Sequence, residues 1–227
     1  MSVSPPAARD DRRPSGAPAG IVLVTASLVA IAAIAHHPTA GRKPTPEELL
    51  AQIVRLQHGD HAVHAFALAA TAALLYGLAV FAIRNDPRRS VVVGGLVAYA
   101  LGSVLVAFAA LTDGFVVPSI AAAYAGHGPA AVTGAVQLLN FCAIVIQVCT
   151  KFWLFATSLA VVLWSAAIVR GGAAQLALAG LGFVAGALVV VLTATSSAVT
   201  PHSLGIVVVL EALWYVGIGV EMIRGRV

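Results

Sequence analysis

The seven histidines of the chain cluster near the ends of its apolar segments. Two close the first segment, three open the second, one lies in a loop and one opens the last. In order, they are His36, His37, His58, His61, His64, His127 and His202. Imidazole ligates metals and titrates near neutral pH. The basic residues considered below place all seven on one side of a membrane, so we expect a metal or proton site near one membrane face.

The densest group lies in residues 57–64, where Asp60, His61 and His64 are spaced to share one helix face. A carboxylate with two imidazoles is a partial ligand set for zinc, copper or iron. Asp60 could instead orient a ligating imidazole by accepting its second N–H. The alternative is a set of interfacial histidines that meet lipid head groups.

The first apolar segment ends in His36-His37-Pro38. Adjacent helical residues point about 100° apart, so one imidazole faces the bundle and can complete the site. The alternative is capping of the helix dipole. The predicted ligand set is therefore His36, His37, Asp60, His61 and His64. Copper is the first expectation and zinc or iron the next, because histidine with carboxylate suits all three.

Three further residues are candidates for orienting the ligands or relaying protons: Asp113, His202 and Glu211. Asp113-Gly114 is also an ordinary turn sequence. Glu211 lies in an apolar run, about 13 Å deeper along its helix than His202. A carboxylate there costs several kcal/mol unless it is protonated or paired. Its expected partner is a histidine of the second segment or Tyr99, in a functional role or in a structural interhelix hydrogen bond.

The composition indicates an integral membrane protein. Hydrophobic residues make up 60% of the 227 and charged residues only 10%, against roughly a quarter in soluble domains. We expect an all-α transmembrane bundle of about six spans, each of about 20 residues. The predicted spans are 19–35, 61–83, 91–112, 152–169, 175–195 and 203–223.

The arginines predict the orientation. They precede the first span, fill the turns after the second and fourth, and follow the last. The positive-inside rule then places both termini in the cytoplasm and the histidines on the outer side of a bacterial inner membrane. The lipid bilayer is the main expected partner. Gly94/Ala98/Gly102 and Gly182/Gly186 favour close packing within the chain, with another membrane subunit or with a second copy. Nothing indicates nucleic-acid binding.

We expect two parts of the chain: a disordered cytoplasmic tail at 1–18 and a single bundle domain at 19–227. Thr45-Pro46-Glu47-Glu48 predicts the start of a short amphipathic helix on the outer membrane surface. Residues 130–169 are too long for one span, so their first half should form, with 115–124, a helical cap on the outer face. A polar stripe on this segment either faces the periplasm or lines the histidine cavity: Thr133, Gln137, Asn140, Gln147 and Lys151.

One alternative concerns the first span. It is short, follows a basic region and ends in Ala33-Ile34-Ala35, a small-x-small pattern typical of signal-peptidase sites. Cleavage there would make His36 the N-terminus, on the periplasmic side, with its amine and ring both free for a metal. Retention as a span is the favoured alternative. Cys142 and Cys149 are interpreted as packing residues rather than a disulfide.

His-His-Pro after the first span, together with Gly-Phe-Val-Val-Pro after the third, resembles a group of small, uncharacterised bacterial multi-pass membrane proteins. The resemblance covers about residues 20–224 and implies no activity. Asp-x-x-x-His at residues 60–64 also resembles a fragment of the membrane copper site of particulate methane monooxygenase.

These observations leave several functions open. The first is a metal site that is redox-active or accessory to a membrane oxidoreductase. The second is a b-type haem or quinone protein, with His64 and His202 as the axial pair to test. A proton or cation transporter and a structural subunit complete the set. The sequence does not decide whether the protein is an enzyme.

Overall fold

The computed structural model describes residues 16–38, 41 and 45–227, and all regular secondary structure in these ranges is helical. The helices are α1 (Ala17–Ala35), α2 (Pro46–Arg84), α3 (Ser90–Leu111), the π-helix η1 (Thr112–Val116), α4 (Val117–Tyr124), α5 (Pro129–Ile168), α6 (Ala173–Thr195) and α7 (Pro201–Ile223). The tail predicted at 1–18 falls almost entirely on residues 1–15, outside the described residues. The all-α prediction is confirmed.

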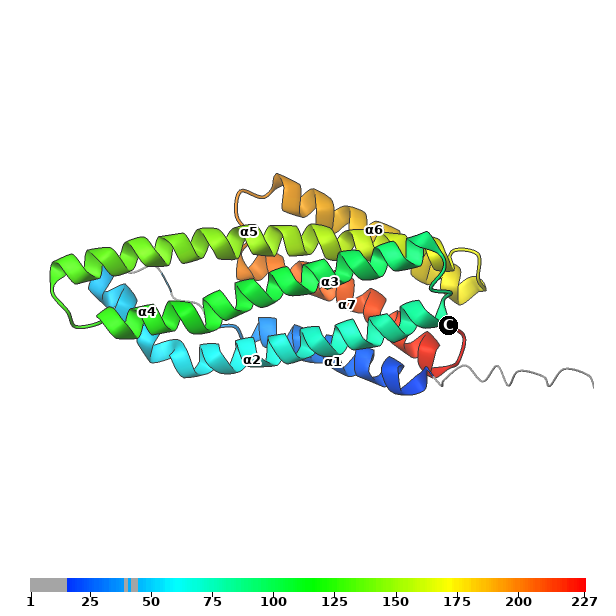
Figure 1. Ribbon diagram of the computed structural model, residues 1–227, viewed down its shortest axis with the longest axis horizontal. Helices are drawn as coiled ribbons and strands as arrows, with labels where there is room; N and C mark the ends of the chain where they lie inside the picture. Colours follow the sequence, from blue (N-terminus) through cyan, green and yellow to red (C-terminus); the bar gives the residue numbers. More distant parts are fainter. Residues whose placement is uncertain (1–15, 39–40, 42–44) are drawn as a thin grey trace, which may run out of the picture.

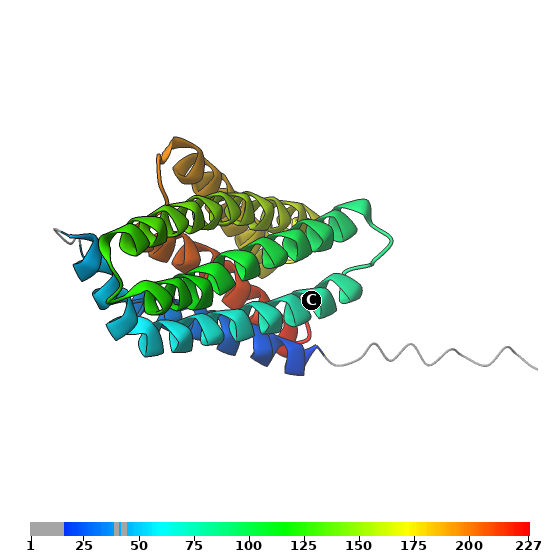
Figure 2. The ribbon, with the colours of Figure 1, turned by 60° about the vertical axis from the view of Figure 1, so that its left-hand side comes forward.

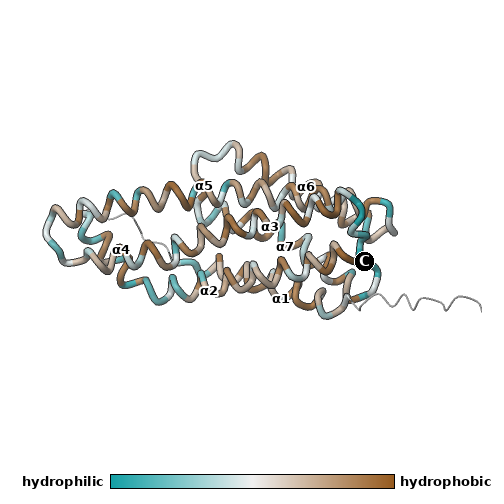
Figure 3. The backbone as a smooth tube through the Cα atoms, in the orientation of Figure 1, coloured by the Kyte–Doolittle hydropathy of each residue, from teal (hydrophilic) through white to brown (hydrophobic). Residues whose placement is uncertain are grey.

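Within the described ranges, six helices are long and apolar enough to cross a membrane, with α3, η1 and α4 counted as one continuous element. The chain is therefore a multi-pass membrane protein, as its composition predicts. The helices run side by side along the long axis of the molecule (Figure 1). Figure 3 shows hydrophobic residues along the shafts of the helices, and hydrophilic residues mainly at the turns and in the extended end.

The arginine-bearing turns meet at one end of the bundle, beside the C-terminus (Figure 1). Arg84 Nε donates to the carbonyl of Val227 at 3.0 Å, and Arg89 donates to the carbonyl of Ala167 at 2.9 Å. Glu221 lies 3.3 Å from Arg224, the pairing that their spacing predicts. Helices distant in sequence thus share one basic end.

Three of the six elements have 35 to 40 residues, against 19 to 23 in the others. At the opposite end of the bundle these long elements continue beyond the others (Figure 2). We call this extension the cap: the first part of α2 (46–58), α4 and the first half of α5 (129–145). Its core is small, with Leu50 of α2 packed beside Ala121 of α4 and Val132 of α5. The cap predicted from the length of the 130–169 segment is therefore present.

The predicted surface helix differs from the structure in one respect. It begins where expected, since the Thr45 hydroxyl accepts from the Glu48 amide at 3.2 Å. It does not end before the second span, because α2 is one helix of 39 residues. Gly59 does not interrupt it, and the apolar face of its first turns packs inside the cap rather than on lipid.

The core of the spanning bundle is aromatic. The rings of Trp164 and Trp214 stack 6.2 Å apart, and both side chains are fully buried. Glycines let the helices approach: a Cβ at Gly102 would lie 3.1 Å from Thr157 Cγ2, and one at Gly186 would lie 2.7 Å from Val162 Cγ2. The predicted small-residue faces thus pack inside this chain, and Cys142 and Cys149 are free, as expected.

Candidate metal centre

A π-helical turn positions the first acidic residue of the site. Asp113-Gly114 is a turn sequence, yet α3 does not end there: it passes through the π-helix Thr112–Val116 directly into α4. The α-helical part of the third span ends at Leu111, one residue before the predicted Thr112, but the chain continues there as helix instead of turning. Single π-turns inside α-helices are frequent at functional sites. Here the turn lies beside His64 of α2, opposite the end of α1.

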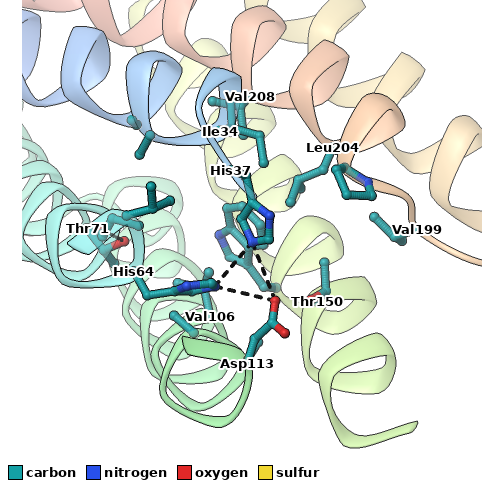
Figure 4. Close-up of a pocket in the computed structure, with 18 of the residues that line it drawn as sticks. Ile34, His37, His64, Thr71, Val106, Asp113, Thr150, Val199, Leu204 and Val208 are labelled. Atoms are coloured by element: carbon teal, nitrogen blue, oxygen red, sulfur yellow. Dashed lines mark hydrogen bonds and ion pairs between the residues drawn. The ribbon is translucent and has the colours of Figure 1, made fainter. Parts of the chain in front are cut away.

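Three side-chain atoms, from α2, from η1 and from the segment that follows α1, form a nearly equilateral triangle (Figure 4). His37 Nε2 lies 3.4 Å from His64 Nε2. Asp113 Oδ2 lies 3.5 Å from His37 Nε2 and 3.4 Å from His64 Nε2. We call these three residues the triad. All three atoms are of kinds that bind divalent transition metals.

The opposite nitrogen of His64 is held by Asp60. His64 Nδ1 lies 2.9 Å from the Asp60 carbonyl oxygen and 3.2 Å from Oδ1 of its carboxylate. A carbonyl can only accept, so Nδ1 carries a proton; when the ring is neutral, its lone pair is then on Nε2, toward the triad. His37, Asp60 and His64 also offer ligand atoms within 4.8 Å of one another. Asp60 nevertheless approaches the ring edge of His64 that faces away from the triad.

The triad depends on Gly114. A Cβ at this position would lie 2.7 Å from His64 Nδ1 and closer still to the Cβ and Cγ of the same residue. Only glycine lets the π-turn approach the imidazole closely enough for Asp113 to reach Nε2. The sequence shows this glycine as half of a turn dipeptide, and the structure shows it as a contact residue.

The triad is sheltered but not sealed. His64 is buried, while the side chains of His37 and Asp113 are 17% and 35% exposed. The two imidazoles meet edge to face, with ring centres 4.9 Å apart. Nδ1 of His37 is buried without a hydrogen-bond partner. This geometry suits a bound cation, because two neutral imidazoles and a carboxylate would jointly offer it lone pairs.

The remaining predicted residues lie outside the triad. His36 is exposed, and its Nδ1 lies 2.9 Å from the Ala32 carbonyl oxygen. His61 stacks on Phe115 at 5.0 Å, and its Nε2 is buried without a partner. The other three histidines are exposed: His58, His127 and His202.

Glu211 forms a second polar cluster deeper in the bundle. Thr157 of α5 donates to its Oε1 at 2.8 Å, and Tyr215 donates to its Oε2 at 2.9 Å. Tyr99, the partner considered from the sequence, lies one step further away, with its ring 6.0 Å from that of Tyr215. The i, i+4 spacing of Glu211 and Tyr215 could have predicted their contact. Thr157, 54 residues away in sequence, carried no such indication.

One cavity of about 370 Å³ joins the two clusters, and the triad residues, Glu211 and Tyr215 all line it. Gln147 also lines it, and clamps the loop between α6 and α7 by accepting from the Val199 amide and donating to its carbonyl, both at 2.8 Å. Lys151 donates to the carbonyl of Ser196 at 2.8 Å. The polar stripe of α5 is therefore divided: Gln147 faces the histidine cavity, whereas Asn140 is exposed.

Comparison with protein-family models, with curated proteins and with solved structures gave no match for this chain. The functional conclusion therefore depends on the chemistry of the site. The triad can hold a cation, and the cavity beside it can admit a further ligand. Asp60 can keep His64 in the tautomer that binding requires.

Proposed function

We propose that this membrane protein binds one zinc ion through His37 Nε2, His64 Nε2 and Asp113 Oδ2. The triangle of 3.4, 3.4 and 3.5 Å carries the proposal. Tetrahedral zinc with bonds of 2.0–2.1 Å separates its ligand atoms by roughly 3.3–3.4 Å. Ligands at right angles, as in tetragonal copper sites, would lie about 2.9 Å apart. The separations thus favour zinc over copper, although copper was the first expectation from the residue types alone.

In this assignment the two acidic residues exchange the roles that the sequence predicted. Asp113 becomes a ligand, and Asp60 orients His64 from the other edge of its ring. Carboxylates in that outer position fix the tautomer and raise the basicity of a ligating histidine. His36, His61 and His202 take no direct part, because none of them contributes an atom to the triangle.

The triad would supply three ligands to the proposed zinc ion, which would leave a fourth position for a ligand from the cavity that the triad lines. Structural zinc sites usually close with four protein ligands, whereas catalytic sites keep three and leave the fourth for water or substrate. Zinc makes a bound water acidic enough to ionise near neutral pH and polarises carbonyl groups. The site therefore suits Lewis-acid or hydrolytic chemistry better than electron transfer. A haem would require a second axial ligand, and His202 is exposed at the first turn of α7.

We infer the location from the arginines. With the basic end in the cytoplasm, the triad lies near the periplasmic face of a bacterial inner membrane, beneath the cap. Both termini are then cytoplasmic. In this orientation α1 crosses the membrane once and ends at Ala35, two residues before His37. A metal site at His37 is therefore close to the membrane interface.

The test is metal analysis of detergent-purified protein from cells grown with zinc, copper and iron. We expect about one zinc per chain in the wild type and almost none in His64→Ala and Asp113→Ala. His36→Ala is the matched control, since its imidazole adjoins His37 in sequence but bonds only within α1. Metal content that is equal in all four proteins would overturn the proposal.

A further inference from the structure

The cavity extends from the triad toward the middle of the membrane. Its outer end lies beside Asp113, near Thr150 of α5 (Figure 4). Its inner end reaches Glu211, which is bonded to Thr157 of the same helix. The seven residues from Thr150 to Thr157 correspond to about 10 Å of helix. The cavity is therefore an elongated space with the proposed metal site at one end.

The walls are mainly aliphatic, although Ser27, whose hydroxyl donates to the carbonyl of Leu23, and Tyr99 also line the cavity. Residues from four helices provide the aliphatic surface: Ala30 of α1, Ala67 of α2, Val106 and Ala109 of α3, and Leu204 and Val208 of α7. Thr71, which also lines the space, donates its hydroxyl to the carbonyl of Ala67 on its own helix at 2.9 Å. The middle of the cavity thus offers little hydrogen bonding to a guest.

A cavity of this kind is unfavourable both when it is empty and when it is filled with water. Protein interiors pack at crystal density, with few voids larger than a water molecule, whereas this cavity of about 370 Å³ is far larger and partly open to its surroundings. An ordered interior water needs two to four polar partners, which the aliphatic walls do not provide. An apolar guest would satisfy the walls, and an oxygen atom on its outer end would satisfy the metal.

We propose that the cavity binds the alkyl chain of a membrane-soluble, lipid-like molecule whose oxygen-bearing head group takes the open position on the metal. The proposal rests on the zinc site for its head group and on the cavity for its chain. The chain length is limited by the cavity, along which the stretch of α5 from Thr150 to Thr157 is roughly 10 Å long. The substrate class is thus a carboxylate, ester or amide of a medium-length aliphatic chain.

Alkyl hydroxamates with chains from butyl to dodecyl test this proposal, because their head group chelates zinc and their chain can be varied alone. Binding to metal-loaded, full-length protein would be followed through the visible spectrum of the cobalt-substituted site. We expect affinity to rise about fourfold for each added methylene, the value for its complete burial. The increase should stop once the chain spans the cavity.

Two substitutions at neighbouring positions distinguish binding of the alkyl chain in the cavity from its partitioning into the surrounding detergent. Val208→Phe projects into the cavity, whereas Val209→Phe projects from the same helix at a side chain that is 41% exposed. We expect the long-chain hydroxamates to lose at least about tenfold in affinity in Val208→Phe and to be unaffected in Val209→Phe. Both variants should keep their cobalt, which also shows that they are folded.

The outcomes distinguish the two proposals. If cobalt binds and hydroxamate affinity is independent of chain length, or is equal in the two valine variants, the lipid-chain proposal fails and the metal site stands. If neither zinc nor cobalt binds to the wild type, the metal site fails and the head-group half of the lipid proposal fails with it. A chain-length dependence that ends near the cavity length and is lost only in Val208→Phe supports both.

Discussion

Replacing Gly114 by alanine tests the geometry of the site without removing any ligand. The new Cβ would lie 2.7 Å from His64 Nδ1, which is 0.7 Å inside the 3.4 Å at which ordinary van der Waals contact begins. The ring cannot simply rotate away, because Nδ1 is bonded to Asp60 on the same helix. Either the imidazole or the π-turn must therefore move by most of an ångström.

A displacement of that size opens the triangle on which tetrahedral coordination depends. We expect Gly114→Ala to weaken zinc binding by roughly 10- to 100-fold, the range seen when groups that orient metal ligands are lost. Overpacking should also cost about 1–3 kcal/mol of stability. Zinc affinity would be measured by competition with a chromophoric chelator, and folding by thermal unfolding in detergent.

Gly134→Ala is the matched control, because a Cβ there meets nothing within 4 Å and mid-helix alanine is favoured over glycine. We expect it to bind zinc like the wild type and to be at least as stable. The reasoning would be refuted if Gly114→Ala were folded and bound zinc as tightly as the Gly134→Ala control.

Three further predictions follow from individual contacts. Asp60→Asn should retain zinc but bind it about tenfold more weakly, since the orienting carboxylate becomes a neutral amide; chelator competition that shows no change would argue against its role. Thr157→Val should lower stability by about 1–3 kcal/mol because one oxygen of Glu211 loses its donor. Thermal unfolding should show no such loss for Thr195→Val, whose hydroxyl bonds only within its own helix. The mature protein should retain α1, so its intact mass should exclude cleavage after Ala35; a mass lacking residues 1–35 would contradict this prediction.

The fold was largely predictable because its main determinant is local. Each spanning helix needs about 20 apolar residues, and hydropathy identifies such runs directly. The prediction of helix boundaries failed where one helix, α2, runs through both the cap and the spanning bundle. The sequence predicted a short surface helix separate from the second span, whereas α2 is continuous through Gly59, which is exposed and has open space around it.

The candidate site was only half predictable. Helical spacing placed Asp60 and His64 on one face, and His37 at the end of the first span could meet them. Spacing could not show which carboxylate lies beside Nε2 of His64. Asp113 approaches this atom from a π-turn, and its sequence, Asp-Gly, is typical of an ordinary turn. The cavity was not predictable either, since its walls come from residues far apart in the chain.

The most direct test of the zinc proposal is X-ray absorption spectroscopy at the zinc edge of the purified, zinc-loaded protein. The triad predicts four nitrogen or oxygen ligands at about 2.0–2.1 Å, with the outer-shell scattering of two imidazoles and no sulfur. Asp113→Asn should change this spectrum, and His36→Ala should leave it unchanged. Six-coordinate zinc, a single imidazole, or a spectrum equally altered by both substitutions would contradict the proposed centre.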